Sequence, residues 1–199
     1  MRRVAKGSGV TSWKDPEIAG VRAILAARQP DADAPPPTFE QRRAMMDANG
    51  ELGSLPRGAF HEPVTVGGVK CERVVPQEAL PGRVLLYLHG GGYTLGSPRS
   101  HRPLIARLGV AAKSVAIAPD YRLGPEHRFP GAVEDAVAVY RALLEGGTEP
   151  GQLIVAGDSA GGGRRERLRQ RLRHAPVRLR RERHALHSDV EHGDCSDGL

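Results

Sequence analysis

The feature of this sequence that most constrains its fold is the alternation of short apolar runs with helical patterns. Residues 83–88, 114–118 and 152–156 are nearly continuous apolar runs, which is typical of strands buried on both faces. Between these runs, apolar residues recur at helical spacing over 101–110 and 131–144. Strands that alternate with helices predict a mainly parallel sheet with helices on its faces, and so an α/β architecture.

The residues ahead of these runs predict an opening hairpin and a helical arm. β-Branched residues dominate 61–66 and 69–75, and the two glycines between them suit the turn of an antiparallel hairpin. Helical spacing also spans 15–27, and Thr38 with Gln41 resembles a capping box that opens a second helix. Residues 1–60 are expected to form an arm that either packs as a cap or stays a loose extension.

Composition excludes several classes of protein. The chain has 199 residues, 39% of them apolar, which is enough for one packed domain. Its longest aliphatic and aromatic run, 84–88, is far too short to cross a bilayer, and no apolar run follows the basic start to form a secretory signal. A cytoplasmic location is expected, and Cys71 and Cys195 suit it because two cysteines cannot build a disulfide framework.

Arginine is concentrated at the end of the chain. Ten of the 29 Lys and Arg residues lie after Gly163, all of them arginines, whereas the four lysines precede it. Acidic residues interleave with these arginines, and the segment has no aromatic residue for base stacking. Binding to RNA, DNA or anionic lipid is therefore the less favoured alternative, and no nucleic-acid partner is expected. We expect a helical arm (1–60), an α/β core (61–163) and an arginine-rich, partly disordered tail (164–199).

The last apolar run leads directly into Gly157-Asp158-Ser159-Ala160-Gly161. This is G-x-S-x-G between a strand and a helix start, where a sharp turn can lift a serine hydroxyl above the sheet. Glycines at 157 and 161 leave room for such a turn, so Ser159 is a candidate nucleophile. The alternative is an ordinary glycine-rich connection between a strand and a helix.

A second glycine motif, His89-Gly90-Gly91-Gly92-Tyr93, follows the apolar run at 84–88. Consecutive glycines can aim bare N–H groups at one developing oxyanion, and the amide of Ala160 would add a further donor. Glycine-rich turns of this kind also bind phosphate, or nothing at all. The two motifs are expected at the same edge of the sheet, and together they favour acyl chemistry.

The residues 119–130 supply charged groups on a loop after a strand. Asp120, Arg122 and His127 do not form a recognisable metal or nucleic-acid site, and we expect structural pairing, such as Asp120 with a nearby arginine. His127 is a poor candidate for a catalytic base because it precedes Ser159, whereas the partners of a G-x-S-x-G serine, an acid and then a histidine, follow it in the chain.

These motifs resemble the hormone-sensitive-lipase-like (GDXG) family of α/β-hydrolases, known mostly as bacterial carboxylesterases, over 64–163. The matching segments are His89 to Tyr93, Leu95-Gly96-Ser97 with His101-Arg102, residues 119–130, Glu134-Asp135 and Gly157 to Gly162. The resemblance implies hydrolysis of small-molecule esters with short to medium acyl chains through an acyl-enzyme, without cofactor or metal. It implies Ser159 as the nucleophile and a set of supporting residues: Gly90, Gly91 and Ala160 as oxyanion donors, with His89, Gly92 and Asp158 organising the loops.

The segment after the serine predicts an incomplete version of this fold. The family has a helix with small apolar residues here, whereas this chain has arginines at 164, 165, 167, 169 and 171. One buried charge without a partner costs about 3–5 kcal/mol, against a domain stability of roughly 5–15 kcal/mol. We therefore expect 164–172 to be solvent-exposed, partly helical and mobile, and interpret Gly163 as the point of a truncation or a change of reading frame.

The catalytic acid and histidine are apparently absent. The fold supplies them after the nucleophile, on two separate loops. Only 40 residues follow Ser159, and among the aspartates only Asp189 precedes a histidine, His192, at a distance of three positions. We do not expect this pair to complete a triad, so a catalytically inactive fragment is the main alternative to an active esterase.

Overall fold

The computed structural model describes residues 19–20, 22–23 and 35–174. The chain divides into two compact units, Met1–Pro37 and Thr38–Leu199. In the first unit, residues 19–20 and 22–23 are helical and residues 35–37 are not, and the rest of the helix predicted at 15–27 lies outside the described residues. The pair Asp189 and His192 also lies outside them, as does the tail from residue 175 onwards.

The second unit is built on a five-stranded mixed sheet, which confirms the α/β class. The strands are β1 (Phe60–Val66), β2 (Val69–Val75), β3 (Val84–Leu88), β4 (Val115–Pro119) and β5 (Leu153–Gly157), in the order β1-β2-β4-β3-β5. β1 and β2 form the antiparallel opening hairpin, and β2 also pairs antiparallel with β4. β3 lies between β4 and β5 and is parallel to both, so the centre of the sheet is parallel, as predicted.

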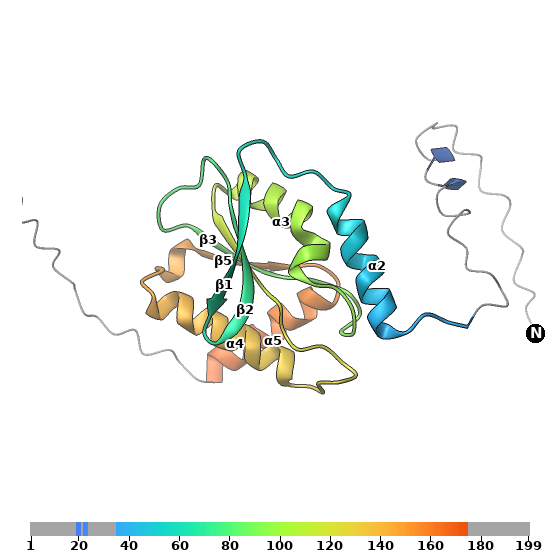
Figure 1. Cartoon of the computed structure of the whole chain (residues 1–199). Coiled ribbons are helices and arrows are strands. Elements are labelled where there is room, and N and C mark those ends of the chain that lie inside the picture. Colours follow the sequence, from blue (N-terminus) through green and yellow to red (C-terminus); the bar gives the residue numbers. More distant parts are fainter. Residues whose placement is uncertain (1–18, 21, 24–34, 175–199) are drawn as a thin grey trace, which may run out of the picture. The chain divides into compact units, whose positions relative to one another are not determined.

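Helices cover both faces of this sheet (Figure 1). On one face, α4 (Gly131–Glu145) and α5 (Ala160–His174) pack over a core that contains Leu86, Leu88 and Ile117. On the other face, α3 (Pro98–Ala112) packs over Leu85, Tyr87 and Ala116. Alternate residues of β3 therefore feed opposite cores, as the two-residue period of a strand requires.

α2 (Phe39–Glu51) lies beside α3 and is held to the unit by polar contacts (Figure 1). It begins with the predicted capping box between Thr38 and Gln41. The Arg43 guanidinium donates to both carboxylate oxygens of Glu126, at 2.9 and 2.8 Å, and this bond holds the pKa of Glu126 down at about 2. Asp47 accepts a 2.5 Å hydrogen bond from Ser97 at the start of α3. α2 is thus fastened to the core by side chains rather than by a buried apolar stripe.

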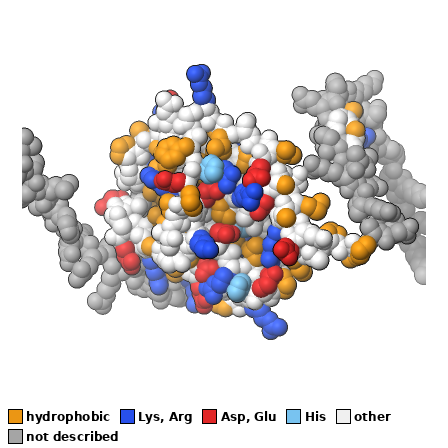
Figure 2. Space-filling view, in the orientation of Figure 1, with side chains coloured by type: hydrophobic (Ala, Val, Ile, Leu, Met, Phe, Trp, Pro, Cys, Tyr) orange, Lys and Arg blue, Asp and Glu red, His pale blue; other side chains and the backbone are white. Residues whose placement is uncertain are grey.

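Ion pairs also join neighbouring strands of the sheet and join a helix to the sheet. Figure 2 shows basic and acidic side chains interleaved over one face of the molecule. The best-buried of the pairs joins Arg102 of α3 to Glu72 of β2 at 2.6 Å, and Arg73 pairs with Glu62 of the neighbouring strand at 2.7 Å. Opposite charges that face each other directly across neighbouring strands, as Glu62 and Arg73 do, stabilise the pairing of those strands.

α5 corrects the expectation that the arginine-rich segment cannot pack. Residues 160–174 are helical, and Arg164 and Leu168 are 2% and 1% exposed. The expectation rested on the cost of an unpartnered buried charge, but the Arg164 guanidinium lies over the ring of Tyr121 and bonds to neighbouring oxygens. Arg165 and Arg167 point to solvent, so only one charge has to be accommodated.

Candidate active site

The turn between β5 and α5 places Ser159 at the surface in a strained conformation. Ser159 has a φ of 46°, in the left-handed region that a residue with a side chain rarely adopts, and it is exposed. Its flanking glycines are required by space: a Cβ at Gly157 would stand 2.5 Å from the carbonyl oxygen of Leu88, and one at Gly161 would overlap that same oxygen. The turn between β5 and α5 therefore packs closely against the last residue of β3, Leu88.

The glycine motif lies at that same end. Leu88 is paired with Gly157 across the parallel strands β3 and β5, so the two motifs leave the sheet side by side. Gly91 and Gly92 have φ values of 113° and 61°, and the amide of Leu95 closes the loop by donating to the carbonyl of Gly91 at 2.8 Å. The structure thus brings together the two motifs that the sequence placed 68 residues apart.

Asp158 connects the two loops. Its Oδ1 accepts hydrogen bonds from the amide of Gly90 at 2.8 Å and from the hydroxyl of Tyr87 at 2.9 Å. Its Oδ2 lies 3.6 Å from Nε2 of His101 on α3. Burial, and then the bond to Asp158, raise the pKa of Tyr87, so this phenol stays protonated and donates to the carboxylate. The sequence analysis named Asp158 but not Tyr87, because the spacing of the two residues does not indicate that they are in contact.

The bond from Gly90 to Asp158 corrects one predicted oxyanion donor. An amide that already donates to a carboxylate is not free to bind a developing oxyanion, so Gly90 does not have the predicted role in this structure. The amides of Gly91 and Gly92 make no hydrogen bond to any part of the chain that is described. Ala160 begins α5, where the first amides of a helix have no intrahelical partner.

His89 lies under the loop and is fully buried. Its Nδ1–H donates to the carbonyl of Gly90 at 2.8 Å, and its ring stacks on Tyr121 at 4.3 Å. Burial lowers the pKa of His89 to about 3, so the imidazole is neutral near pH 7. A buried neutral ring bonded to its own loop holds the backbone in place rather than exchanging protons with a ligand.

Arg164 is the residue of this region that sequence reasoning placed wrongly. Its Nη1 donates to the carbonyl of His89 at 3.2 Å and to the hydroxyl of Tyr121 at 2.9 Å. Tyr121 in turn donates to the same carbonyl of His89. The guanidinium lies 4.2 Å from the ring centre of Tyr121 and 5.0 Å from that of Tyr93, so two aromatic faces cover it.

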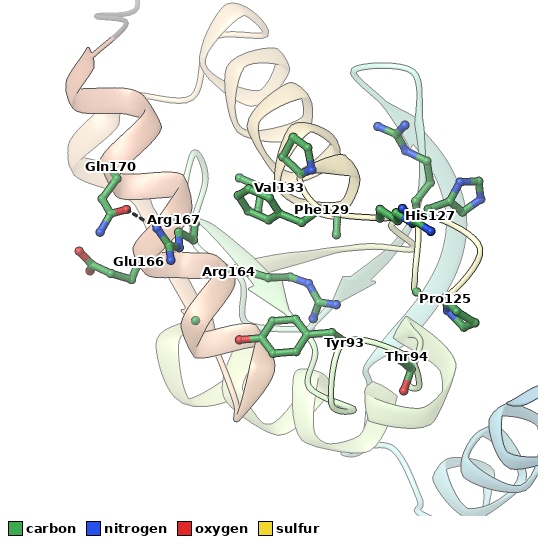
Figure 3. Close-up of a pocket in the computed structure, with 16 residues that line it drawn as sticks. Tyr93, Thr94, Pro125, His127, Phe129, Val133, Arg164, Glu166, Arg167 and Gln170 are labelled. Atoms are coloured by element: carbon green, nitrogen blue, oxygen red, sulfur yellow. Dashed lines mark hydrogen bonds between the residues drawn. The ribbon is translucent and has the colours of Figure 1, made fainter.

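The charged loop after β4 pairs differently from the expectation. Arg122 donates to both carboxylate oxygens of Asp135 on α4, at 2.7 and 3.0 Å, and also reaches Glu134 at 3.4 Å. Among the described residues no arginine pairs with Asp120, and burial raises the pKa of Asp120. His127 lines a pocket of about 790 Å³ between this loop, α4 and α5 (Figure 3).

Neither a metal-binding cluster nor a membrane-spanning helix occurs among the described residues. Within residues 35–174 and the four described residues before them, no group of three His, Cys, Asp or Glu side chains could hold a metal ion. No helix in the described part of the chain has the length and apolar character needed to cross a bilayer.

Comparison with known proteins places the chain in a family. Residues 85–182 match the α/β-hydrolase fold family, a span that includes α5. The chain is 46% identical over 166 residues to an acetyl-hydrolase of Streptomyces hygroscopicus, covering 82% of this chain and 54% of the relative. It is 38% identical to the putative acetyl-hydrolase LipR of Mycobacterium tuberculosis, covering 73% of this chain and 45% of the relative.

Solved structures agree with the sequence relatives. The crystal structure of an esterase from the bacterial hormone-sensitive lipase family superposes with a TM-score of 0.74 at 37% identity, covering 83% of this chain and 55% of that one. This chain spans about half the length of the curated relatives it matches. On its motifs, its fold and these matches, the chain belongs to the hormone-sensitive-lipase-like α/β-hydrolases, a family of serine-hydrolase-type enzymes.

Proposed function

We propose that Ser159 is the nucleophile of an esterase site for small-molecule esters with short to medium acyl chains. One observation carries this proposal: Ser159 sits at positive φ on the turn between β5 and α5, beside a loop with unbonded glycine amides. Two relatives are named as acetyl-hydrolases, and this supports a short acyl group.

The reaction would proceed through a covalent acyl-enzyme. Ser159 Oγ bonds to the ester carbonyl carbon, and the carbonyl oxygen takes up the negative charge. The bond from that carbon to the alcohol oxygen then breaks, and the alcohol leaves with the proton that the Ser159 hydroxyl has lost. The amides of Gly91 and Ala160, with Gly92 as a further unbonded amide of the loop, would donate to that oxygen. Each such donor contributes about 3–4 kcal/mol to stabilising the transition state. Water then attacks the acyl-enzyme, releases the acid and restores Ser159.

The general base is not assigned to a described residue. No hydrogen bond joins Ser159 to a histidine within residues 35–174, and His89 is buried and bonded to Gly90. The absence of a catalytic acid and histidine from this chain therefore stays a prediction. Loss of these partners would lower turnover by a factor of roughly a million.

Hydrolysis of p-nitrophenyl butyrate tests the proposal directly. We expect the chain to release nitrophenol and the Ser159→Ala variant to fall to the rate of buffer. Ser54→Ala, which changes an exposed serine on the loop between α2 and β1, should keep the full rate. Equal trace rates in all three proteins would instead support the inactive fragment.

Covalent labelling separates a competent nucleophile from turnover. A fluorophosphonate reagent should add one group to the chain and to Ser54→Ala, but none to Ser159→Ala, when measured by intact mass. Labelling without turnover would show that Ser159 is activated, because phosphonylation needs a base to take up the serine proton. No labelling of Ser159 would support the inactive fragment. Labelling at another serine would refute the role of Ser159.

A further inference from the structure

Arg164 is a buried cation that has no acidic partner. It is 2% exposed, and no carboxylate of residues 35–174 lies within ion-pair distance of it. Only Nη1 is bonded, to neutral oxygens, and Nε is buried with no partner in the described part of the chain. Burial lowers the pKa of Arg164, yet an arginine stays protonated in a protein. Its charge is therefore present, and Asp158 acts on it from beyond ion-pair distance.

This cation forms part of the pocket beside α5. Figure 3 shows the Arg164 side chain extending from α5 into the pocket, with the Tyr93 ring on one side and Phe129 and Val133 on the other. Phe129 is 74% exposed, although it is a large apolar side chain. A pocket of about 790 Å³ with an apolar wall and one fixed charge has the size and character of a small-molecule site.

The other charges around the pocket leave it positive. Arg128 and Arg167 also line it, whereas the charge of Arg122 is neutralised by Asp135. The acidic lining residue is Glu166, and it pairs with Arg169 at 3.7 Å on the outer side of α5. Nothing acidic in the lining therefore competes for Arg164.

We propose that this pocket binds a carboxylate anion that carries a short hydrocarbon chain. The carboxylate would accept a hydrogen bond from Nη2 of Arg164, because Nη1 is already bonded and Nε is buried, and the chain would lie against Phe129 and Val133. A guanidinium is well matched to a carboxylate, and the apolar wall favours an anion with a hydrocarbon chain over an inorganic one. The proposal does not depend on ester hydrolysis, because Ser159 is not part of the lining.

Binding of hexanoate to the full chain, measured by calorimetry, tests the proposal without a mutation. Hexanamide has the same shape and no charge, so it serves as the matched ligand, and acetate and sulfate test the need for the chain. We expect hexanoate to bind at least about tenfold more tightly than hexanamide, acetate or sulfate. Equal binding of hexanoate and hexanamide would overturn the role of the cation, and tighter binding of sulfate would overturn the role of the hydrocarbon chain.

Two neighbouring arginines provide the matched variants. Arg164→Met should weaken hexanoate binding about tenfold or more and abolish the preference over hexanamide. Arg165→Met removes an exposed arginine that is not in this lining, and should change the affinity less than twofold. Phe129→Ala removes part of the apolar wall and changes no buried side chain. It therefore still tests the proposal if the Arg164→Met variant does not fold. Full affinity in folded Arg164→Met or in Phe129→Ala, or equal losses in the two arginine variants, would refute the proposal.

Discussion

α4 and α5 are helices of equal length on the same face of the sheet, yet their sequences differ sharply. Both contain 15 residues, and both contribute to the core around Leu86 and Leu88. α4 buries an ordinary apolar stripe that includes Val133, Ala136 and Val139. α5 carries six arginines and offers the core a single row of residues four apart: Ala160, Arg164, Leu168 and the half-buried Leu172.

The comparison of α4 with α5 shows that a single row of buried residues is enough to pack a helix on the sheet when the first turn of that helix already contacts the sheet. α5 follows β5 directly, and Gly161 in its first turn lies against the end of β3, so both strands position the start of the helix. The other arginines face solvent, where they need no partner. The buried one, Arg164, is tolerated because Tyr121, Tyr93 and the carbonyl of His89 surround it with compatible groups.

The largest expected effect tests the start of each helix. Gly161→Ala should lower the free energy of unfolding by about 3 kcal/mol, because the added Cβ meets backbone carbonyls that cannot move aside. Gly131→Ala at the start of α4 is the matched control, since its Cβ would only reach the Arg122 side chain at 3.5 Å. Urea denaturation measures both. A Gly161→Ala variant as stable as the wild type would mean that α5 does not begin against β3.

The packing of the two helices can be compared at one leucine in each. Leu168→Ala in α5 should cost about 2.5 kcal/mol, similar to Leu144→Ala in α4, because both side chains are buried at 1% and 8% exposure. Leu52→Ala, at 79% exposure, should cost little. If Leu168→Ala behaves like Leu52→Ala in the same denaturation experiment, α5 is a surface helix and the comparison fails.

Acid should destabilise the side of the core that lies under α5. The folded pKa of His89, about 3, is below its ordinary value of 6.5, so the unfolded chain binds the proton more readily. The titration of His89 therefore leaves the stability of the folded chain unchanged above pH 6.5, and the free energy of unfolding falls as the pH drops from 6.5 towards 3. Between pH 7 and pH 5 we expect a loss of about 2 kcal/mol in the free energy of unfolding. His89→Asn should flatten that part of the pH profile, and an unchanged profile would show that His89 does not titrate in this way.

The smallest effect concerns the row of α5 itself. Arg164→Met should raise the free energy of unfolding by about 1 kcal/mol, because an apolar residue replaces a buried charge while Tyr121 keeps its bond to the carbonyl of His89. Arg165→Met should stay within about 0.5 kcal/mol of the wild type. Thermal and urea unfolding give both values. A marked loss of stability in Arg164→Met would mean that the guanidinium is a necessary part of the core.

Local signals predicted most of the elements. The helix at 131–144 and the strands agree with the structure to within one residue at their described ends, because their patterns are local. α3 begins at Pro98 rather than at 101, since Ser97 and Ser100 form a capping box and proline suits the first helical turn. That signal was present in the sequence but was hidden by a polar first turn.

Contacts between distant residues explain what the sequence did not predict. The sequence does not distinguish between the amides of three consecutive glycines. In the structure, the amide of Gly90 is bonded because it donates to the carboxylate of Asp158, which lies 68 residues later in the chain. The burial of Arg164 likewise depends on Tyr93 and Tyr121, which lie in two separate loops. A pattern of residue types carries no information on which partner a buried charge will find.

By itself, the sequence determined the class of the fold, the order of its elements and the two glycine motifs, because strand and helix periods and tight turns are properties of short segments. Only the tertiary structure decided which amides stay unbonded, that a charged helix packs on the sheet, and that a cation lies beside an apolar wall. Those outcomes depend on hydrogen bonds and burial between segments far apart in the chain, and such contacts exist only once the sheet has brought the segments together.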